Sequence, residues 1–311
     1  MTRLITIGSI AALFFSSTFV LNRAMSLAGG HWAWTASLRF GFMLIFLVLL
    51  LLVTQGKKAL VEIKNIFLEH WLFWILAGSI GFGVFYALIS FSASYAAGWI
   101  MATTWQTTIL ATPIVLTFFG RKVPTKGLLL IGVIFIGIVL VNIEHVSLTD
   151  TKTLVYSALP VLIAAFAYPI GNQLVWEARM GHHKNIPHIQ DPILDNGFAR
   201  VLLLTLGSLP FWAVILLFTS PPAPSSGQLI STALVALFSG VIATTLFLYA
   251  RHLSRNSSEI AAVDATQSLE VVFSLIGEIV FLGGALPGPL GMAGLALTIL
   301  GLVMYMRVQN A

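Results

Sequence analysis

Three carboxylates lie in one apolar stretch of the sequence, residues 260–282: Asp264, Glu270 and Glu278. A helix advances by about 100° per residue, so Asp264, Gln267 and Glu278 share one face of this stretch and Glu270 lies beside that face. Glu270 falls near the middle of the stretch, whereas Asp264 and Glu278 fall near its two ends. A charge in apolar surroundings is costly, and a carboxylate there can bind a proton or a cationic group. We therefore predict a binding role for Gln267 and Glu270, while the two end acids are either functional or simply interfacial.

Two arginines could meet the end acids. Arg39 lies inside a second apolar stretch, and Arg200 begins a third. With a helical rise of about 1.5 Å per residue, depth permits a pair between Arg39 and Glu278 at one end and a pair between Arg200 and Asp264 at the other. Pairs that form and break in alternation would act as gates. Pairs that stay formed would only neutralise buried charge, and both readings remain open.

Aromatic and amide side chains recur on three further apolar stretches. The candidate binding residues there are Tyr86, Trp105, Gln106, Tyr168 and Asn172. Rings that alternate with amide groups suit flat or cationic amphiphiles, through stacking and cation–π contact. The alternative interpretation is that such residues pack helices together or anchor them at a membrane interface.

The composition indicates where these residues must be held. The chain of 311 residues is 58% hydrophobic and 9% charged, and its mean hydropathy is +0.96. Soluble proteins carry about 25% charged residues, so the composition excludes a soluble enzyme, a disordered protein and a nucleic-acid binder. A crossing of the hydrocarbon core takes about 20 helical residues. We predict an all-α integral membrane protein with ten transmembrane helices, at residues 4–22, 32–54, 71–92, 99–119, 127–143, 154–176, 197–218, 229–250, 260–282 and 290–306.

Basic residues predict the orientation. Thirteen of them fall on one side of the predicted helices, namely Arg3, Lys57, Lys58, Lys64, Arg121, Lys122, Lys126, Arg179, Lys184, Arg200, Arg251, Arg255 and Arg307. Only Arg23 and Lys152 fall on the other side. Because lysine and arginine are enriched in cytoplasmic loops, we expect both termini in the cytoplasm, which requires an even number of crossings.

The two halves of the chain resemble each other. A shift of 161 residues keeps register across three predicted helices without a gap and places Gln106 on Gln267. The first predicted helix matches the sixth at a shift of 150. The halves, residues 1–150 and 151–311, would each hold five helices and therefore have opposite orientations. Inverted repeats of this kind are typical of transporters that open a central site to each side in turn.

The last predicted helix of each half is rich in glycine, at Gly127, Gly132, Gly137, Gly291, Gly294 and Gly301. With this pattern, the chain resembles the drug/metabolite transporter superfamily of EamA type, and most of all its multidrug resistance efflux transporter branch. The resemblance implies a central cavity lined by helices 1–4 and 6–9, with helices 5 and 10 peripheral. It implies no particular substrate. Small four-helix relatives carry an essential glutamate in their first helix, whereas this chain has Ser16, Ser17 and Thr18 there and no acid.

We predict a secondary active transporter of the bacterial cytoplasmic membrane that exports small aromatic or cationic compounds by alternating access. Proton exchange at Glu270 would drive it, because the chain has no phosphate-binding loop and cannot use ATP. The alternatives are a carrier of amino acids or other metabolites, with Arg39 or Arg200 binding a substrate carboxylate, and, from another class, an intramembrane enzyme.

The expected partners are a small-molecule substrate, protons and membrane lipid, with no nucleic acid, and we expect a monomer. The chain contains no cysteine, which excludes disulfides and thiolate metal sites. His182, His183 and His188 share a polar loop whose spacing fits no metal motif, so we expect a solvated loop. No enzymatic activity and no cofactor or metal are expected.

Overall fold

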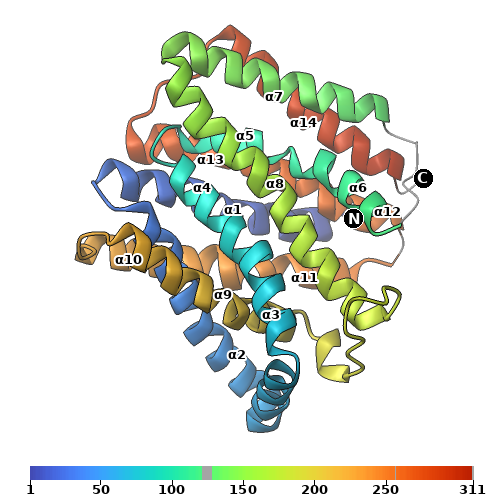
Figure 1. Ribbon diagram of the computed structural model, residues 1–311. Coiled ribbons are helices and arrows are strands. Elements are labelled where there is room, and N and C mark those ends of the chain that lie inside the picture. The colour runs from blue at the N-terminus through green and yellow to red at the C-terminus, as the bar shows by residue number, and fades with distance from the viewer. Residues whose placement is uncertain (121–127, 256, 310–311) are drawn as a thin grey trace.

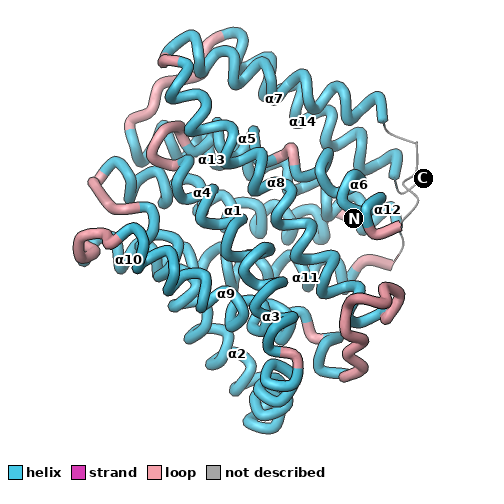
Figure 2. Tube along the Cα trace, viewed as in Figure 1, coloured by secondary structure: helices cyan, strands magenta, loops and turns pink. Residues whose placement is uncertain are grey.

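The computed structural model describes residues 1–120, 128–255 and 257–309. Within these residues every regular element is a helix, and no strand occurs (Figure 2). Eight helical stretches there are long and apolar enough to cross a membrane, and the apolar helix Pro289–Tyr305 is shorter. The chain is therefore a multi-pass membrane protein, as the composition predicted. Four residues used above lie outside the described residues, namely Arg121, Lys122, Lys126 and Gly127.

Six of the predicted apolar stretches correspond to single helices, which are α1 (Thr2–Leu27), α2 (Trp32–Glu69), α7 (Leu128–Leu148), α8 (Thr151–Met180), α9 (Gly197–Thr219) and α14 (Pro289–Gln309). Helix α2 continues beyond its predicted end at residue 54. It bends at Gly56, whose φ of 79° suits glycine. Beyond the bend, Ala59, Ile63 and Ile66 are buried at helical spacing, so this segment packs on the molecule through an apolar face.

The other four stretches are interrupted helices. Two of them contain a π-helical segment, in the series α3 (Trp71–Gly78), η1 (Ser79–Val84), α4 (Phe85–Ser92) and the series α10 (Ser226–Val235), η3 (Ala236–Ala243), α11 (Thr244–Leu253). The other two break near their middle, in the series α5 (Gly98–Trp105), α6 (Thr108–Phe118) and the series α12 (Ser257–Ala265), η4 (Thr266–Ser268), α13 (Leu269–Leu282). A short 3₁₀ helix, η2 (Pro192–Asp195), precedes α9. Such interruptions are common at functional sites, because they redirect side chains and backbone groups.

Helices α1 and α8 lie at the centre of the molecule, as Figure 1 shows. Helix α1 packs against α13, η3 and α11, whereas α8 packs against α4, η1 and α6. Helix α2 packs against α9, and α7 pairs with α14 along one edge of the bundle (Figure 1). Gly81 lies against Gly171 where η1 crosses α8, and Gly137 lies against Gly294 where α7 crosses α14. These crossings are close because no side chain separates the two backbones.

The bundle has two ends with different loops. Helix α1 begins and α14 ends at the same end, on the right of Figure 1, together with the loop 181–196. We call this end the terminal face. The turns 28–31, 93–97, 220–225 and 283–288 lie at the other end, which we call the opposite face.

Candidate functional site

A cavity of about 670 Å³ lies between α1, α2, α8, α9 and the four interrupted stretches. None of the described residues of α7 and α14 lines it, so this pair is peripheral, as the resemblance implied. The lining extends from Arg179 and Arg251, next to the terminal face, to Thr18 and Tyr86 deeper in the bundle. Because Arg251 is exposed to solvent, the cavity opens toward the terminal face. Its volume is that of a typical site for a small organic molecule.

Arg39 lies in the apolar part of α2, before the bend at Gly56, and its side chain lines the cavity. The residue is only 8% exposed. Its guanidinium carbon lies 3.9 Å from the centre of the Tyr86 ring, and its Nη2 donates a hydrogen bond to Ser239 Oγ at 3.2 Å. Among the described residues, no carboxylate oxygen lies within 4.0 Å of it. The ring and one hydroxyl therefore hold the cation in place of a counter-ion.

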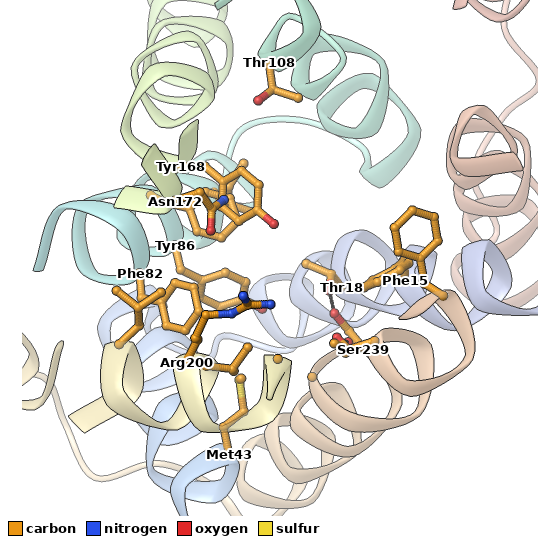
Figure 3. Close-up of a pocket in the computed structure, with 18 of the residues that line it drawn as sticks. Phe15, Thr18, Met43, Phe82, Tyr86, Thr108, Tyr168, Asn172, Arg200 and Ser239 are labelled. Carbon is orange, nitrogen blue, oxygen red and sulfur yellow. Dashed lines mark hydrogen bonds between the residues drawn. The ribbon is translucent and has the colours of Figure 1, made fainter. Parts of the chain in front are cut away.

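Aromatic side chains form one wall of the cavity. The rings of Phe85, Trp105 and Tyr168 contact one another, with centroids 4.9 to 5.6 Å apart. The ring centroid of Phe85 lies 5.8 Å from that of Tyr86, and Tyr86 extends the aromatic wall to Arg39. Figure 3 shows Tyr86, Tyr168 and Asn172 on the same side of the cavity. Tyr168 is 37% exposed although it lies on a central helix, because its ring faces the open space of the cavity.

Two polar residues of the broken stretch α12–η4–α13 also line the cavity. Gln267 lies in η4, and Glu270 lies in the first turn of α13. Glu270 is 8% exposed and makes no hydrogen bond or ion pair with any other described residue. The break in the helix thus brings a carboxylate to the cavity at the point where α13 begins.

The rim at the terminal face is rich in arginine. Arg179 forms an ion pair with Asp195, and Arg251 lies 3.4 Å from Asp264. Arg200, at the start of α9, is half-buried and lines the cavity close to the first of these pairs. The entrance therefore presents several guanidinium groups, two of which have acidic partners.

Two layers of contacts close the cavity toward the opposite face. In the first layer, Thr18 Oγ1 donates to Ser239 Oγ at 2.7 Å, drawn as a dashed line in Figure 3, and Tyr86 Oη donates to Asn22 Oδ1 at 3.1 Å. These bonds join α1 to η3 and to α4. They form a polar floor beneath the open part of the cavity.

The second layer surrounds Glu278, which is 4% exposed. Its carboxylate accepts a hydrogen bond of 2.9 Å from the backbone N–H of Gly98, at the start of α5, and lies 3.9 Å from Arg23 Nε. Arg23 also donates to the carbonyl of Ala93 at 3.0 Å. The end of α1, the end of α13 and the turn before α5 are thereby fastened together at the opposite face.

The structure gives the end acids different partners from those expected by depth. Glu278 faces Arg23 rather than Arg39, and Asp264 faces Arg251 rather than Arg200. Depth along a helix does not specify the direction in which a side chain points, and Arg39 points toward Tyr86 instead. The expected pairs, Arg39 with Glu278 and Arg200 with Asp264, are therefore absent among the described contacts of this structure.

Six of the seven expected binding residues line the cavity, namely Tyr86, Trp105, Tyr168, Asn172, Gln267 and Glu270. Gln106 does not belong to the lining, because it is buried at the end of α5 and its amide donates to the carbonyl of Ala102. Thr18, Ser239 and Phe85 also line the cavity and were not among the expected binding residues. Hydroxyls and phenylalanines are too common in membrane helices to stand out. Only Ser239 lies within a π-helical segment, η3, whereas Thr18 lies in α1 and Phe85 begins α4.

Comparison with known proteins agrees with this architecture. Residues 2–311 match the family model described as "EmrE: Putative multidrug resistance efflux transporter". The chain is 40% identical to "Uncharacterized protein YjlA" of Bacillus subtilis (strain 168), over 97% of this chain and 93% of that protein. It is 36% identical to "Uncharacterized 42.1 kDa protein in intracellular alkaline protease 3'region" of Shouchella clausii, over 80% of this chain and 65% of that protein. A solved crystal structure with 15% sequence identity covers 100% of this chain and 98% of its own, with a TM-score of 0.60, which shows the fold alone. The chain belongs to the family that this model describes, "EmrE: Putative multidrug resistance efflux transporter".

Proposed function

We propose that the chain exports small aromatic compounds by alternating access. The observation that carries this proposal is the asymmetry of the cavity. It opens beside Arg251 at the terminal face and is closed beneath Tyr86 and again at Glu278. A site that is accessible from one side and sealed from the other by breakable polar contacts is what an alternating-access cycle needs in one of its two end states.

The helix bounds support two inverted halves, residues 1–150 and 151–311. Adding 161 to the bounds of α7 gives 289–309, which are the bounds of α14. Adding 161 to the last residue of α4 gives 253, the last residue of α11. The break after α5 contains Gln106, and the corresponding residue is Gln267 in η4. This correspondence favours ten crossings and a rocking motion about the cavity.

The terminal face is assigned to the cytoplasm in this proposal, and the membrane is the bacterial cytoplasmic membrane. The support is the basic residues at that face, including Arg3, Arg179 and Arg251, together with an even number of crossings. The cavity then faces the cytoplasm in this structure, which is the state that loads a substrate for export.

Glu270 is the proposed proton-exchanging group. It is buried, lines the cavity and makes no ion pair with any other described residue. A buried carboxylate without a cationic partner binds a proton readily, since protonation removes a charge that is costly to bury. The break between α12 and α13 places it at the cavity rather than in the helix packing.

A carrier of anionic or zwitterionic metabolites is the second candidate. Among the described residues, the cavity lining contains four arginines, Arg39, Arg179, Arg200 and Arg251, and one acidic residue, Glu270. A cationic drug would enter against this charge, whereas an anionic group would be attracted by it.

The direct test is flux through proteoliposomes. Purified protein is reconstituted, a panel of aromatic solutes is loaded, and efflux is measured with and without a pH gradient. We expect wild-type protein to move at least one aromatic solute, and Glu270→Gln to lose the dependence on the pH gradient. Glu69→Gln, at an exposed position outside the cavity, is the matched control. If no solute moves, the export function is refuted, and if Glu270→Gln keeps the wild-type pH dependence, Glu270 is not the coupling group.

A further inference from the structure

We propose that Arg39 binds an anionic group of the substrate, and that the cavity is therefore selective for small aromatic anions. This inference deepens the export function proposed above and rests on it. Three observations carry it: the state of the Arg39 guanidinium, the charge of the cavity lining, and the position of the aromatic wall.

The guanidinium of Arg39 lacks a counter-ion among the residues that the structure describes. The residue is only 8% exposed, and no oxygen of a described carboxylate lies within 4.0 Å of its guanidinium nitrogens. One of its nitrogens, Nη2, donates to Ser239, whereas Nε has no hydrogen-bond partner among the described residues. A buried charge is stable only when it is paired or hydrogen-bonded. In the empty cavity, the Arg39 guanidinium thus has neither a counter-ion nor a partner for Nε among the described residues, and an anion that enters would supply both.

The surroundings of Arg39 fix its geometry. Its guanidinium carbon lies 3.9 Å from the centre of the Tyr86 ring, and Tyr86 is itself held by Asn22 at 3.1 Å. Stacking on a ring leaves the N–H groups at the edge of the guanidinium plane free to donate. The planar fork of an arginine matches the oxygens of a carboxylate or phosphate. The side chain is therefore oriented before any ligand arrives, which lowers the cost of binding.

The charge of the lining selects against cations. Arg179 and Arg251 stand at the rim with their partners Asp195 and Asp264. Deeper in the cavity, Arg39 has no acidic partner within the described part of the chain, and Arg200 also lines the cavity. An anion that passes the rim therefore meets two further positive charges, at Arg200 and Arg39, against one described carboxylate, Glu270, in a cavity whose apolar walls weaken screening by water.

The aromatic wall identifies the rest of the ligand. Phe85, Trp105 and Tyr168 form a continuous ring surface, and Tyr86 connects this surface to Arg39. A compound with one aromatic ring system and one acidic group can stack on the wall while its anionic end reaches the guanidinium. The cavity volume of about 670 Å³ accommodates such a compound.

The test uses three indole compounds that differ in charge and hardly in size: indole-3-propionate, its neutral amide indole-3-propionamide, and the cationic tryptamine. Binding to purified protein in nanodiscs is measured by isothermal titration calorimetry. We expect the propionate to bind most tightly. Arg39→Gln should weaken the propionate about tenfold or more and leave the amide unchanged. Arg39→Lys, which keeps the charge but loses the fork, should give an intermediate loss.

The matched control is Arg307→Gln, at an exposed arginine outside the cavity, which should bind all three compounds as wild type does. If Arg39→Gln does not fold, the ranking of the three compounds on wild-type protein still decides the matter. Binding of tryptamine or the amide as tightly as the propionate would overturn the proposal. So would a failure of wild-type protein to bind the propionate, or an unchanged propionate affinity in folded Arg39→Gln.

The two proposals fail in different ways. Export of a cationic solute by Arg39→Gln at the wild-type rate would overturn the anion site and leave the export function intact. Arg39-dependent binding of the propionate without flux of any aromatic solute in proteoliposomes would refute the export function and leave the anion site intact.

Discussion

Replacing Glu278 with glutamine should open the cavity toward the opposite face. The change removes the charge that faces Arg23 at 3.9 Å and weakens the hydrogen bond that the carboxylate accepts from Gly98 at 2.9 Å. Glutamine keeps the shape and one acceptor oxygen, so the fold should persist. Because the substitution acts on the closing contact and leaves the cavity lining unchanged, it tests the closure separately from substrate binding.

The size of the effect follows from the burial of the contact. A hydrogen bond to a charged group contributes about 1.5–3 kcal/mol, and Glu278 is only 4% exposed, which limits screening by water. The retained acceptor and the bond from Arg23 to the Ala93 carbonyl reduce the loss. We expect the closed state to be destabilised by about 1–3 kcal/mol, which shifts the ratio of open to closed protein by a factor of about 5 to 150.

The assay uses the absence of cysteine from the chain. A single substitution, Ile89→Cys, places a thiol in the cavity lining near the floor, and a membrane-impermeant maleimide is added from one side at a time. Glu278→Gln should speed labelling from the opposite face. The matched control is Glu144→Gln, which removes a buried carboxylate that accepts from Gly288 and Gly291 in the peripheral helix pair. Equal labelling rates in the two variants would refute the closing role of Glu278.

Two further substitutions test the packing and the aromatic wall. Gly207→Leu should destabilise the fold by about 1–3 kcal/mol or more, because a side chain there would collide with the backbone of Trp74. The control is Gly41→Leu, where the space around the glycine is open. Equal melting temperatures for the two variants would contradict this prediction. Trp105→Ala should weaken binding of indole-3-propionate about three- to tenfold, because stacking on the indole ring is lost. The control, Trp71→Ala, changes an exposed tryptophan outside the cavity and should leave the affinity unchanged. Equal losses in both tryptophan variants would count against the aromatic wall.

The helical architecture was predictable because a bilayer imposes a simple rule on sequence. Long runs of apolar residues bounded by charge must be helices, and the predicted stretch 71–92 coincides with the run from α3 through α4. The interruptions were not predictable in the same way. No proline or charge lies at the break at Gln106 or in the π-helical turn around Ser239, so no local pattern marks either interruption.

The cavity lining was predicted better than the charge pairs. Tyr86, Tyr168 and Glu270 were found because rings and acids in apolar helices are conspicuous and face inward when they are buried. The partner of Glu278 was missed, since depth along a helix is readable from sequence but the angle between two helices is not. Arg23 lies near the end of α1, and α1 lies beside α13 only in the folded bundle.

If Arg39 binds the anionic group of the substrate, its guanidinium, which has no counter-ion among the described residues, would give the membrane potential a direct role. An empty cavity holds one uncompensated positive charge at this position, whereas a cavity that has bound a monovalent anion holds none there. The loaded protein would then reorient outward without moving net charge at Arg39, and the empty protein would carry its positive charge back toward the negative interior. A full elementary charge is worth about 2.3 kcal/mol per 100 mV. The voltage across the membrane would thus act on the return of the empty carrier, and export of an anion would be electrogenic even without an exchanged ion.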